Sequence, residues 1–328
     1  MIERDFPKNL PDFQARFGTE EACAEYLFQQ KWPTGFKCSV CGCTEAHLLP
    51  TRPIYVCYGC RHHHSITSGT AFHGTRKGLV KWFLALYFVA TSKQGVSAME
   101  LQWQVGLGSY RTAWTWLHKL RRCMVDPNRT PLSGFVEVDE TWIGGPKEGK
   151  RGRGAAGKTV VACAVEKNGS ALGRVRLAVI ADCSKKKLTD FVLGKLELES
   201  TVHTDGWSGY GDLERHGYAH FRDVIDGGED QAHVALPGVH RVFSLLKRWL
   251  MGTHQGAISR KHLQSYLSEY EFRFNRRTSG SRTHLFQRLM EGAVRDGFWT
   301  YDGIVGRTTQ LVQRAKLAVG DSRSHIIR

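Results

Sequence analysis

The chain has 328 residues, of which 41% are hydrophobic, and a formal net charge of +15 from 46 Lys and Arg against 31 Asp and Glu. The apolar content excludes a disordered chain, and the sequence lacks the run of about 18 apolar residues that predicts a transmembrane helix. A basic excess of this size favours nucleic acid as the partner over an anionic membrane surface. The first thirty residues show no signal-peptide pattern, so we expect a soluble intracellular protein.

The N-terminal region, residues 1–75, contains six of the nine cysteines. Four of them form two C-x2-C pairs with 15 residues between the pairs: Cys38 and Cys41, then Cys57 and Cys60. This spacing predicts a structural zinc ion held by four thiolates. Cys43 and the histidines at 62–64 are alternative ligands. Because four cysteines already satisfy zinc, we expect these side chains to lie outside the site and the histidines to be exposed.

The middle region, residues 76–130, is helical in its pattern. Hydrophobic residues recur at helical spacing over 79–89, and two shorter helices are expected over 98–104 and 110–122, each preceded by a serine that can cap it. Two short helices of which the second is basic are typical of a helix-turn-helix that binds DNA, with a solvated helical bundle as the alternative. The basic residues of the last helix that we expect to contact DNA are Arg111, Lys119, Arg121 and Arg122.

From residue 131 the pattern changes to strands that alternate with helices. The expected strands are 135–139, 159–165, 175–180 and 201–203, and the expected helices are 184–196, 238–251, 259–274 and 283–295. This order predicts a layered α/β domain. The glycine-rich loop 144–158 is strongly basic, and its residues expected to contact DNA phosphates are Lys147, Lys150, Arg151 and Arg153.

Two acids of this domain stand at strand ends. Asp139 ends the first expected strand and Asp205 follows the fourth, while His240 begins a helix on which Lys247 lies two turns later on the same face. Carboxylates that converge from two strands suit a pair of divalent ions that act on a phosphodiester. Each acid alone has an ordinary explanation as a solvated or turn residue. The prediction therefore depends on their combination with the cysteine pairs and the positive charge.

Taken together, these motifs resemble the DDE-type insertion-sequence transposases that carry an N-terminal zinc ribbon. The likeness runs from about Cys38 to Arg277 and includes the sequences VEVDET, TDGWSGY and FRFNRR. It implies an RNase H-like domain, with a mixed sheet and flanking helices, in which Asp139 and Asp205 bind Mg²⁺ or Mn²⁺ and Lys247 holds a phosphate. It further implies DNA contacts from the late helices through Arg248, Arg276 and Arg277.

The sequence departs from this family at the third metal ligand. The family usually has Glu seven residues before the basic residue, and this chain has His240 there, so the resemblance implies an Asp-Asp-His variant. A neutral imidazole suits Mn²⁺ better than Mg²⁺. Glu229 and Asp230 are the alternative source of a third acid.

The resemblance implies a transposase that binds the ends of a mobile DNA element and cuts and joins strands. Residues 1–75 and 76–130 would read terminal inverted repeats, 131–300 would catalyse, and 301–328 would be an extension. The partners would be the two DNA ends, the target DNA and a second copy of the chain, in the cytoplasm on the nucleoid. A catalytically inactive transposase-derived DNA-binding protein, which His240 permits, and an RNase H-like nuclease are the alternatives.

Overall fold

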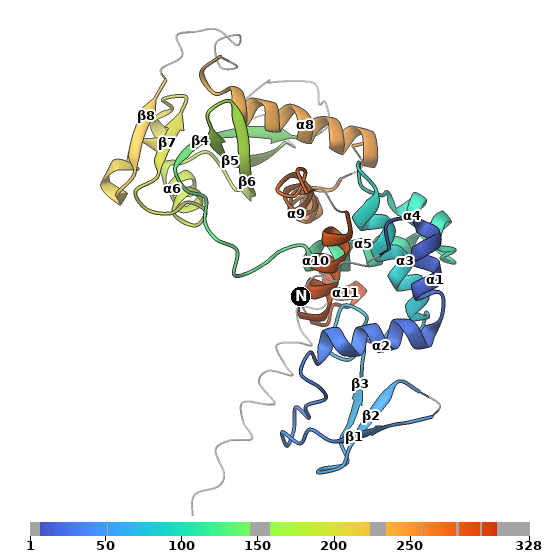
Figure 1. Ribbon diagram of the computed structural model, residues 1–328. Helices are drawn as coiled ribbons and strands as arrows, with labels where there is room; N and C mark the ends of the chain where they lie inside the picture. Colours follow the sequence, from blue (N-terminus) through green and yellow to red (C-terminus); the bar gives the residue numbers. More distant parts are fainter. Residues whose placement is uncertain are drawn as a thin grey trace, which may run out of the picture. The chain divides into compact units, whose positions relative to one another are not determined.

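The chain divides into two compact units. The computed structural model describes residues 7–50, 52–144, 158–223, 234–256, 258–279, 282–295 and 297–306 (Figure 1). The first unit comprises Met1–Thr91, Ala98–Cys123 and Thr283–Arg328, and the second comprises Ser92–Ser97 and Met124–Arg282. Within the described residues, no helix combines the length and the apolar character needed to cross a bilayer.

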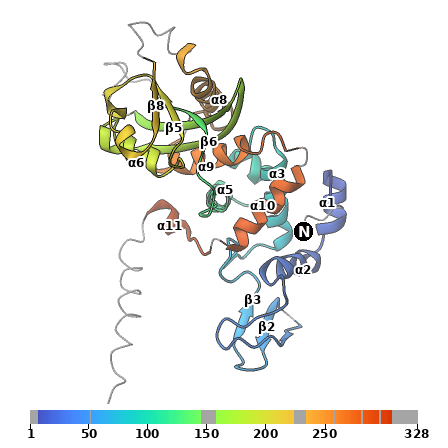
Figure 2. The same ribbon diagram turned by 60° about the vertical axis from the view of Figure 1, so that its left-hand side comes forward.

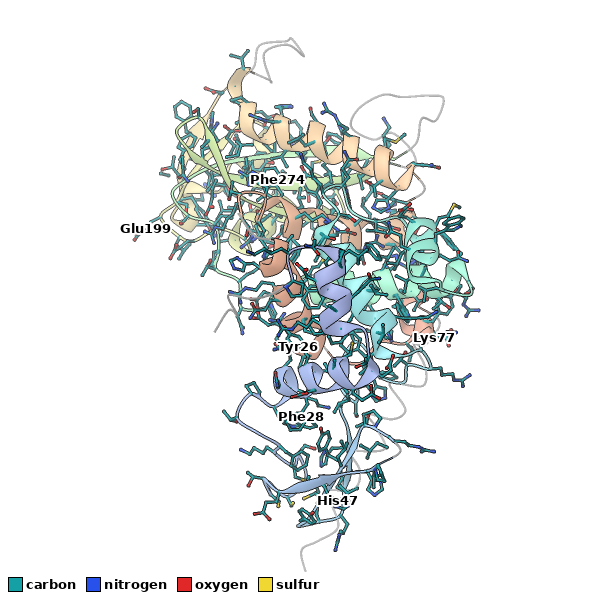
Figure 3. All side chains as sticks on the ribbon, turned by 45° about the vertical axis from the view of Figure 1, so that its right-hand side comes forward. Tyr26, Phe28, His47, Lys77, Glu199 and Phe274 are labelled. Carbon is teal, nitrogen blue, oxygen red and sulfur yellow. The ribbon has the colours of Figure 1, made fainter. Side chains whose placement is uncertain are left out.

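The first unit begins with two capped helices and a small sheet. Asn9 caps α1 (Leu10–Phe17) by accepting from the amide of Asp12, and Thr19 caps α2 (Glu20–Lys31) in the same way. Three short antiparallel strands follow in the order β1-β2-β3: β1 (Ala46–Leu48), β2 (Ile54–Cys57) and β3 (His63–Ser65). Phe28 extends from α2 toward these strands, where its ring lies 4.8 Å from that of Tyr55 (Figure 3).

The remaining helices of the first unit pack into an aromatic core. They are α3 (Leu79–Thr91), α4 (Ala98–Val105), α5 (Tyr110–Cys123), α10 (Arg282–Arg295) and α11 (Tyr301–Val305). The three helices expected between residues 79 and 122 are therefore present. The carboxylate of Glu20 accepts from the first amides of α3, those of Leu79 at 2.6 Å and Val80 at 3.1 Å, and so caps that helix from α2.

Helix α10 belongs to the first unit although the sequence grouped it with the domain 131–300. Phe286 is buried, and its ring lies 5.5 Å from that of Phe13 and 6.2 Å from that of Phe83. The chain thus returns after the second unit to complete the core of the first. Such long-range packing leaves no local signature in the sequence, which is why the expected boundary at residue 300 differs from the observed division.

The second unit is built on a five-stranded mixed sheet. Its strands are β4 (Phe135–Ile143), β5 (Thr159–Asn168), β6 (Ala171–Ile180), β7 (Thr201–Thr204) and β8 (Ala219–Arg222). They lie in the order β6-β5-β4-β7-β8, with β4, β5 and β6 antiparallel, and with β7 parallel to both β4 and β8. Counted along the chain this is the order 3-2-1-4-5, which confirms the expected RNase H-like fold. The four expected strands are present, and the fifth, β8, was not predicted.

Helices cover both faces of this sheet (Figures 1 and 2). One core lies under α8 (Pro237–His254) and α9 (Leu263–Phe274). The one-turn helix η3 (Arg260–His262) directly precedes α9. The other core lies under α6 (Lys185–Leu193). It includes Tyr210 of the short helix η1 (Ser208–Tyr210) and Leu213, which directly precedes the short helix η2 (Glu214–His216). Because side chains alternate along a strand, β4 sends Val136 and Val138 to the α6 face and Glu137 and Asp139 to the α8 face.

The carboxylate of Glu137 caps α8 from the strand below it. Leu236, the residue at the N-cap position, makes no side-chain cap, and Glu137 instead accepts from the Val239 amide at 2.8 Å. A negative charge at this end of a helix is favourable because the first amides lack partners within the helix. Glu137 is 2% exposed and also lies 3.4 Å from the Lys167 ammonium. A Cβ at Gly238 would lie 2.7 Å from its Oε2, so glycine permits this approach.

We expect Glu137→Gln to lower the free energy of unfolding by about 2 kcal/mol, because it removes one charge of a buried pair while leaving an acceptor for Val239. Urea denaturation of the full chain measures this change. In the double variant Glu137→Gln/Lys167→Met the loss should be smaller than the sum of the two single losses. Additive losses would contradict the pairing.

Candidate active site and zinc centre

Four cysteine sulfurs gather at the small sheet of the first unit. The Sγ atoms of Cys38, Cys41, Cys57 and Cys60 all lie within 4.8 Å of one another, and the Cys38–Cys60 and Cys41–Cys57 distances are both 3.5 Å. Four thiolates bound to zinc at about 2.3 Å in a tetrahedron lie roughly 3.8 Å apart. The cluster therefore fits a structural zinc ion.

Hydrogen bonds prepare Cys38 for such an ion. Burial raises the pKa of the Cys38 thiol, but bonds from the backbone at Cys41 and Val40 outweigh burial and bring the pKa down to about 5. His64 is buried, and its Nε2 lies 3.2 Å from Cys38 Sγ. The expectation that all three histidines are exposed is thus wrong for His64, because the alternation of β3 turns this one inward.

We expect Cys41→Ser to reduce the zinc content of the purified full chain to less than about half of the wild-type value, because one of four thiolates is lost. Cys43→Ser is the matched control, since the Cys43 thiol lies outside the four-cysteine group and donates to the Glu45 carbonyl at 3.6 Å. Atomic absorption measures both. An equal loss of zinc in the two variants would show that Cys43 is a ligand.

In the second unit, the two predicted acids belong to neighbouring parallel strands: Asp139 lies in β4, and Asp205 follows the end of β7. In the parallel pair of β4 and β7, Glu137 lies opposite His203. The printed pairing of β4 with β7 ends here, and Asp139 and Asp205 each come two residues later in the sequence, Asp205 directly after the last residue of β7. Burial raises the pKa of Tyr210 well above its usual value, and the carboxylates of Glu140, Asp139 and Asp205 raise it further.

His240 reaches the same place from α8. Its Nε2 lies 3.6 Å from Asp139 Oδ2, with the imidazole 22% and the carboxylate 12% exposed. The histidine follows directly after Val239, whose amide is held by Glu137, so the helix cap sets its position. The structure thus brings His240 and Asp139 together.

Lys247 lies two turns after His240 on α8 and is exposed. Partial burial of its ammonium group and the positive charge of Lys158 lower the pKa of Lys247, while the Asp139 carboxylate opposes the change. The Lys247 ammonium therefore lies within electrostatic range of both the Lys158 ammonium and the Asp139 carboxylate. Positive charges in this position suit a bound phosphate.

The donor set of this site suits a hard divalent cation. Carboxylate oxygens together with one imidazole nitrogen are ligands that Mn²⁺ and Mg²⁺ accept. Among the described residues, the four cysteines are the group of three or more potential ligands gathered within 4.8 Å. Asp139, Asp205 and His240 therefore do not all bring a ligand atom within that distance of one another in this structure. The alternative acids, Glu229 and Asp230, lie outside the described residues.

The basic residues of α5 differ in their exposure. Arg111 is exposed and its guanidinium lies 3.8 Å over the Tyr301 ring, and the half-buried Arg122 lies 3.7 Å over the Trp299 ring. Lys119 is 9% exposed, donates to the Ala71 carbonyl at 3.2 Å and has a pKa lowered by burial. Arg121 is 2% exposed. The expectation that Lys119 and Arg121 contact DNA is therefore not supported, because neither is accessible in this structure.

The arginines of the second unit also differ in their exposure and in their partners. Arg248 is exposed, and the half-buried Arg276 lies 4.1 Å over the Phe272 ring. Arg277 is exposed, and it donates to the Phe274 carbonyl at 2.9 Å and to the Gly173 carbonyl at 3.2 Å, so it joins the end of α9 to β6. The basic residues expected in the glycine-rich loop lie outside the described residues: Lys147, Lys150, Arg151 and Arg153.

Sequence reasoning missed two carboxylates of β4, Glu137 and Glu140. Both are buried, and each has a defined partner: Val239 and Lys167 for the first, and the Tyr210 hydroxyl for the second. The signal was present in VEVDET, since a central strand with three acids must pair or bond each of them. Whether an acid of this strand binds a metal ion or supports the fold depends on its partner. These partners are distant in sequence, so the sequence pattern alone does not make the distinction.

Comparison with known proteins gives two domain matches and two relatives. Residues 131–275 match the ISXO2-like transposase domain, and residues 18–63 match a transposase zinc-ribbon domain. The chain is 27% identical over 280 residues to an uncharacterized protein in transposable element ISH50 of Halobacterium salinarum, covering 78% of this chain and 91% of that protein. It is 25% identical over 121 residues to an uncharacterized transposase-like protein of Haemophilus influenzae, covering 37% of this chain and 97% of that protein.

Proposed function

We propose that this chain, which carries the zinc ribbon and the DDE-type domain of an insertion-sequence transposase, binds the ends of a mobile DNA element and catalyses strand cleavage and strand transfer. The observation that carries the proposal is the arrangement of the second unit. His240 Nε2 lies 3.6 Å from Asp139, and Asp205 follows the strand that pairs in parallel with β4. These residues lie within the segment that matches the transposase domain.

The chemistry follows from the charges of the site. Asp139, Asp205 and His240 would hold two divalent ions, which when bound activate an attacking oxygen and stabilise the leaving oxygen of a phosphodiester. Lys247 would orient the phosphate, and the low exposure of Asp139 limits competition from water. Because imidazole is neutral, the ligand set carries one negative charge fewer than three carboxylates would. We therefore expect weaker ion binding and a preference for Mn²⁺ over Mg²⁺.

DNA binding would involve both units. The net charge of +15 favours the phosphate backbone, and the match of residues 18–63 to a transposase zinc ribbon supports recognition of terminal inverted repeats by the first unit. Exposed basic side chains such as Arg111 and Arg248 are available for such contacts. Since transposition joins two ends, a homodimer or higher oligomer on DNA is part of the proposal.

Replacing either acid should stop cleavage. Asp139→Asn or Asp205→Asn should reduce Mn²⁺-dependent nicking of DNA that carries the element ends by at least about 100-fold, since even the neighbours of metal ligands contribute 10–100-fold. Asp212→Asn is the control, because this acid pairs with Lys185 at 3.1 Å and Arg215 at 3.6 Å in the same unit. Undiminished nicking by the Asp139 variant would refute the assignment. Sequence-specific binding without any cleavage would support the inactive DNA-binding protein instead.

Arg248→Ala should weaken binding to DNA of any sequence and should lower the slope of log K against log salt by about 1, as expected for the loss of one phosphate contact. Arg215→Ala is the matched control, because this exposed arginine of the same unit lies 3.6 Å from the Asp212 carboxylate, which offsets its charge. Fluorescence anisotropy at several salt concentrations measures both. Equal slopes for the two variants would remove Arg248 from the DNA interface.

A further inference from the structure

A buried hydrogen bond joins the two chain segments that carry the catalytic acids. The Tyr210 hydroxyl donates to Glu140 Oε2 at 2.9 Å, and the two residues are 0% and 5% exposed. We infer that Tyr210 and Glu140 are a positioning pair, which fixes the segment bearing Asp205 against the strand bearing Asp139. The catalytic consequence of this inference rests on the proposed function.

The Glu140 end of the pair is attached directly to Asp139. Glu140 is the next residue on β4, and its amide donates to Asp139 Oδ1 at 2.7 Å. Because neighbouring side chains of a strand point to opposite faces, Glu140 reaches the α6 face while Asp139 stays on the α8 face. A shift of the Glu140 side chain is thus transmitted to Asp139 through the peptide bond between them.

The Tyr210 end is attached to Asp205 through a short, tightly packed turn. Asp205 Oδ1 accepts from the Trp207 amide at 3.0 Å, and Tyr210 ends the one-turn helix η1 that follows. A Cβ at Gly209 would lie 2.7 Å from Leu188 Cδ1, so the turn lies closely against α6. The turn has little freedom to move unless Tyr210 moves with it.

The Tyr210 hydroxyl keeps its proton under all ordinary conditions. Burial raises the pKa of Tyr210 well above its usual value, and the carboxylates of Glu140, Asp139 and Asp205 raise it further. The hydroxyl is therefore a permanent donor to Glu140. Without it, the buried Glu140 carboxylate loses this partner and the turn loses this bond to β4.

Tyr218 offers a matched control for a purely structural role. It lies in the same core cluster, is 3% exposed, and donates its hydroxyl to the Leu196 carbonyl at 3.2 Å. Tyr218→Phe and Tyr210→Phe thus each remove one buried hydroxyl from the same core. Only the second removes a bond to the strand that carries Asp139.

The test uses the full chain in both variants, with two readouts. Hydrogen exchange without added Mn²⁺ should be at least about fivefold faster over residues 205–211 in Tyr210→Phe, and unchanged there in Tyr218→Phe. The affinity for Mn²⁺, measured by electron paramagnetic resonance of free Mn²⁺, should fall by about tenfold in Tyr210→Phe and by less than about twofold in Tyr218→Phe.

Unchanged exchange over 205–211 in Tyr210→Phe would overturn the inference, as would equal losses of Mn²⁺ affinity in the two variants. If the wild-type chain bound no Mn²⁺, the proposed function would fail, and the exchange comparison would still decide whether the pair fixes the turn. Faster exchange confined to Tyr210→Phe would support the pair in either case.

Discussion

The register between the parallel strands β4 and β7 is the constraint on which the candidate active site depends. Glu137 lies opposite His203, and Asp139 and Asp205 each follow two residues after this pair, the second directly beyond the end of β7. A slip of one residue would turn one acid to the opposite face, because side chains alternate with a period of two. The same inward row of β4 contains Glu137, which holds the N-terminus of α8 and thereby the position of His240. Strand β4 thus carries Asp139 and holds the start of the helix that carries His240.

Patterns that are local in the sequence predicted their structures well. The two C-x2-C pairs predicted a cluster that the four sulfurs form. The alternation over 135–139 and the run of β-forming residues over 159–165 predicted strands that pair in the sheet. Strand β8 was missed because its four residues show little burial pattern and become a strand only by pairing with β7. The place of Phe286 in the first core depends on contacts with residues some 270 positions earlier, such as Phe13. Local pattern carries no information about such contacts.

Charge was the least reliable guide to the site. Counting basic residues on α5 assigned Lys119 and Arg121 to DNA, yet the second half of that helix is buried on almost every side and both residues with it. Arg277 likewise binds backbone carbonyls of its own unit. The buried carboxylates of β4, in contrast, indicate the position of the site better than exposed cations do, since each buried carboxylate must be satisfied by a specific partner. The pairings of Glu137 and Glu140 show how one strand supports the site from both faces of the sheet.

The central claim is that His240 takes the place of a third carboxylate and shares a divalent ion with Asp139 and Asp205. Pulsed electron paramagnetic resonance of Mn²⁺ bound to the full chain tests it directly, because a coordinated imidazole nitrogen modulates the electron spin echo. We expect this nitrogen modulation in the wild-type protein and its loss in His240→Ala, with some Mn²⁺ binding retained. Mn²⁺ bound at Asp139 without nitrogen modulation in the wild-type protein would show that His240 is not a ligand.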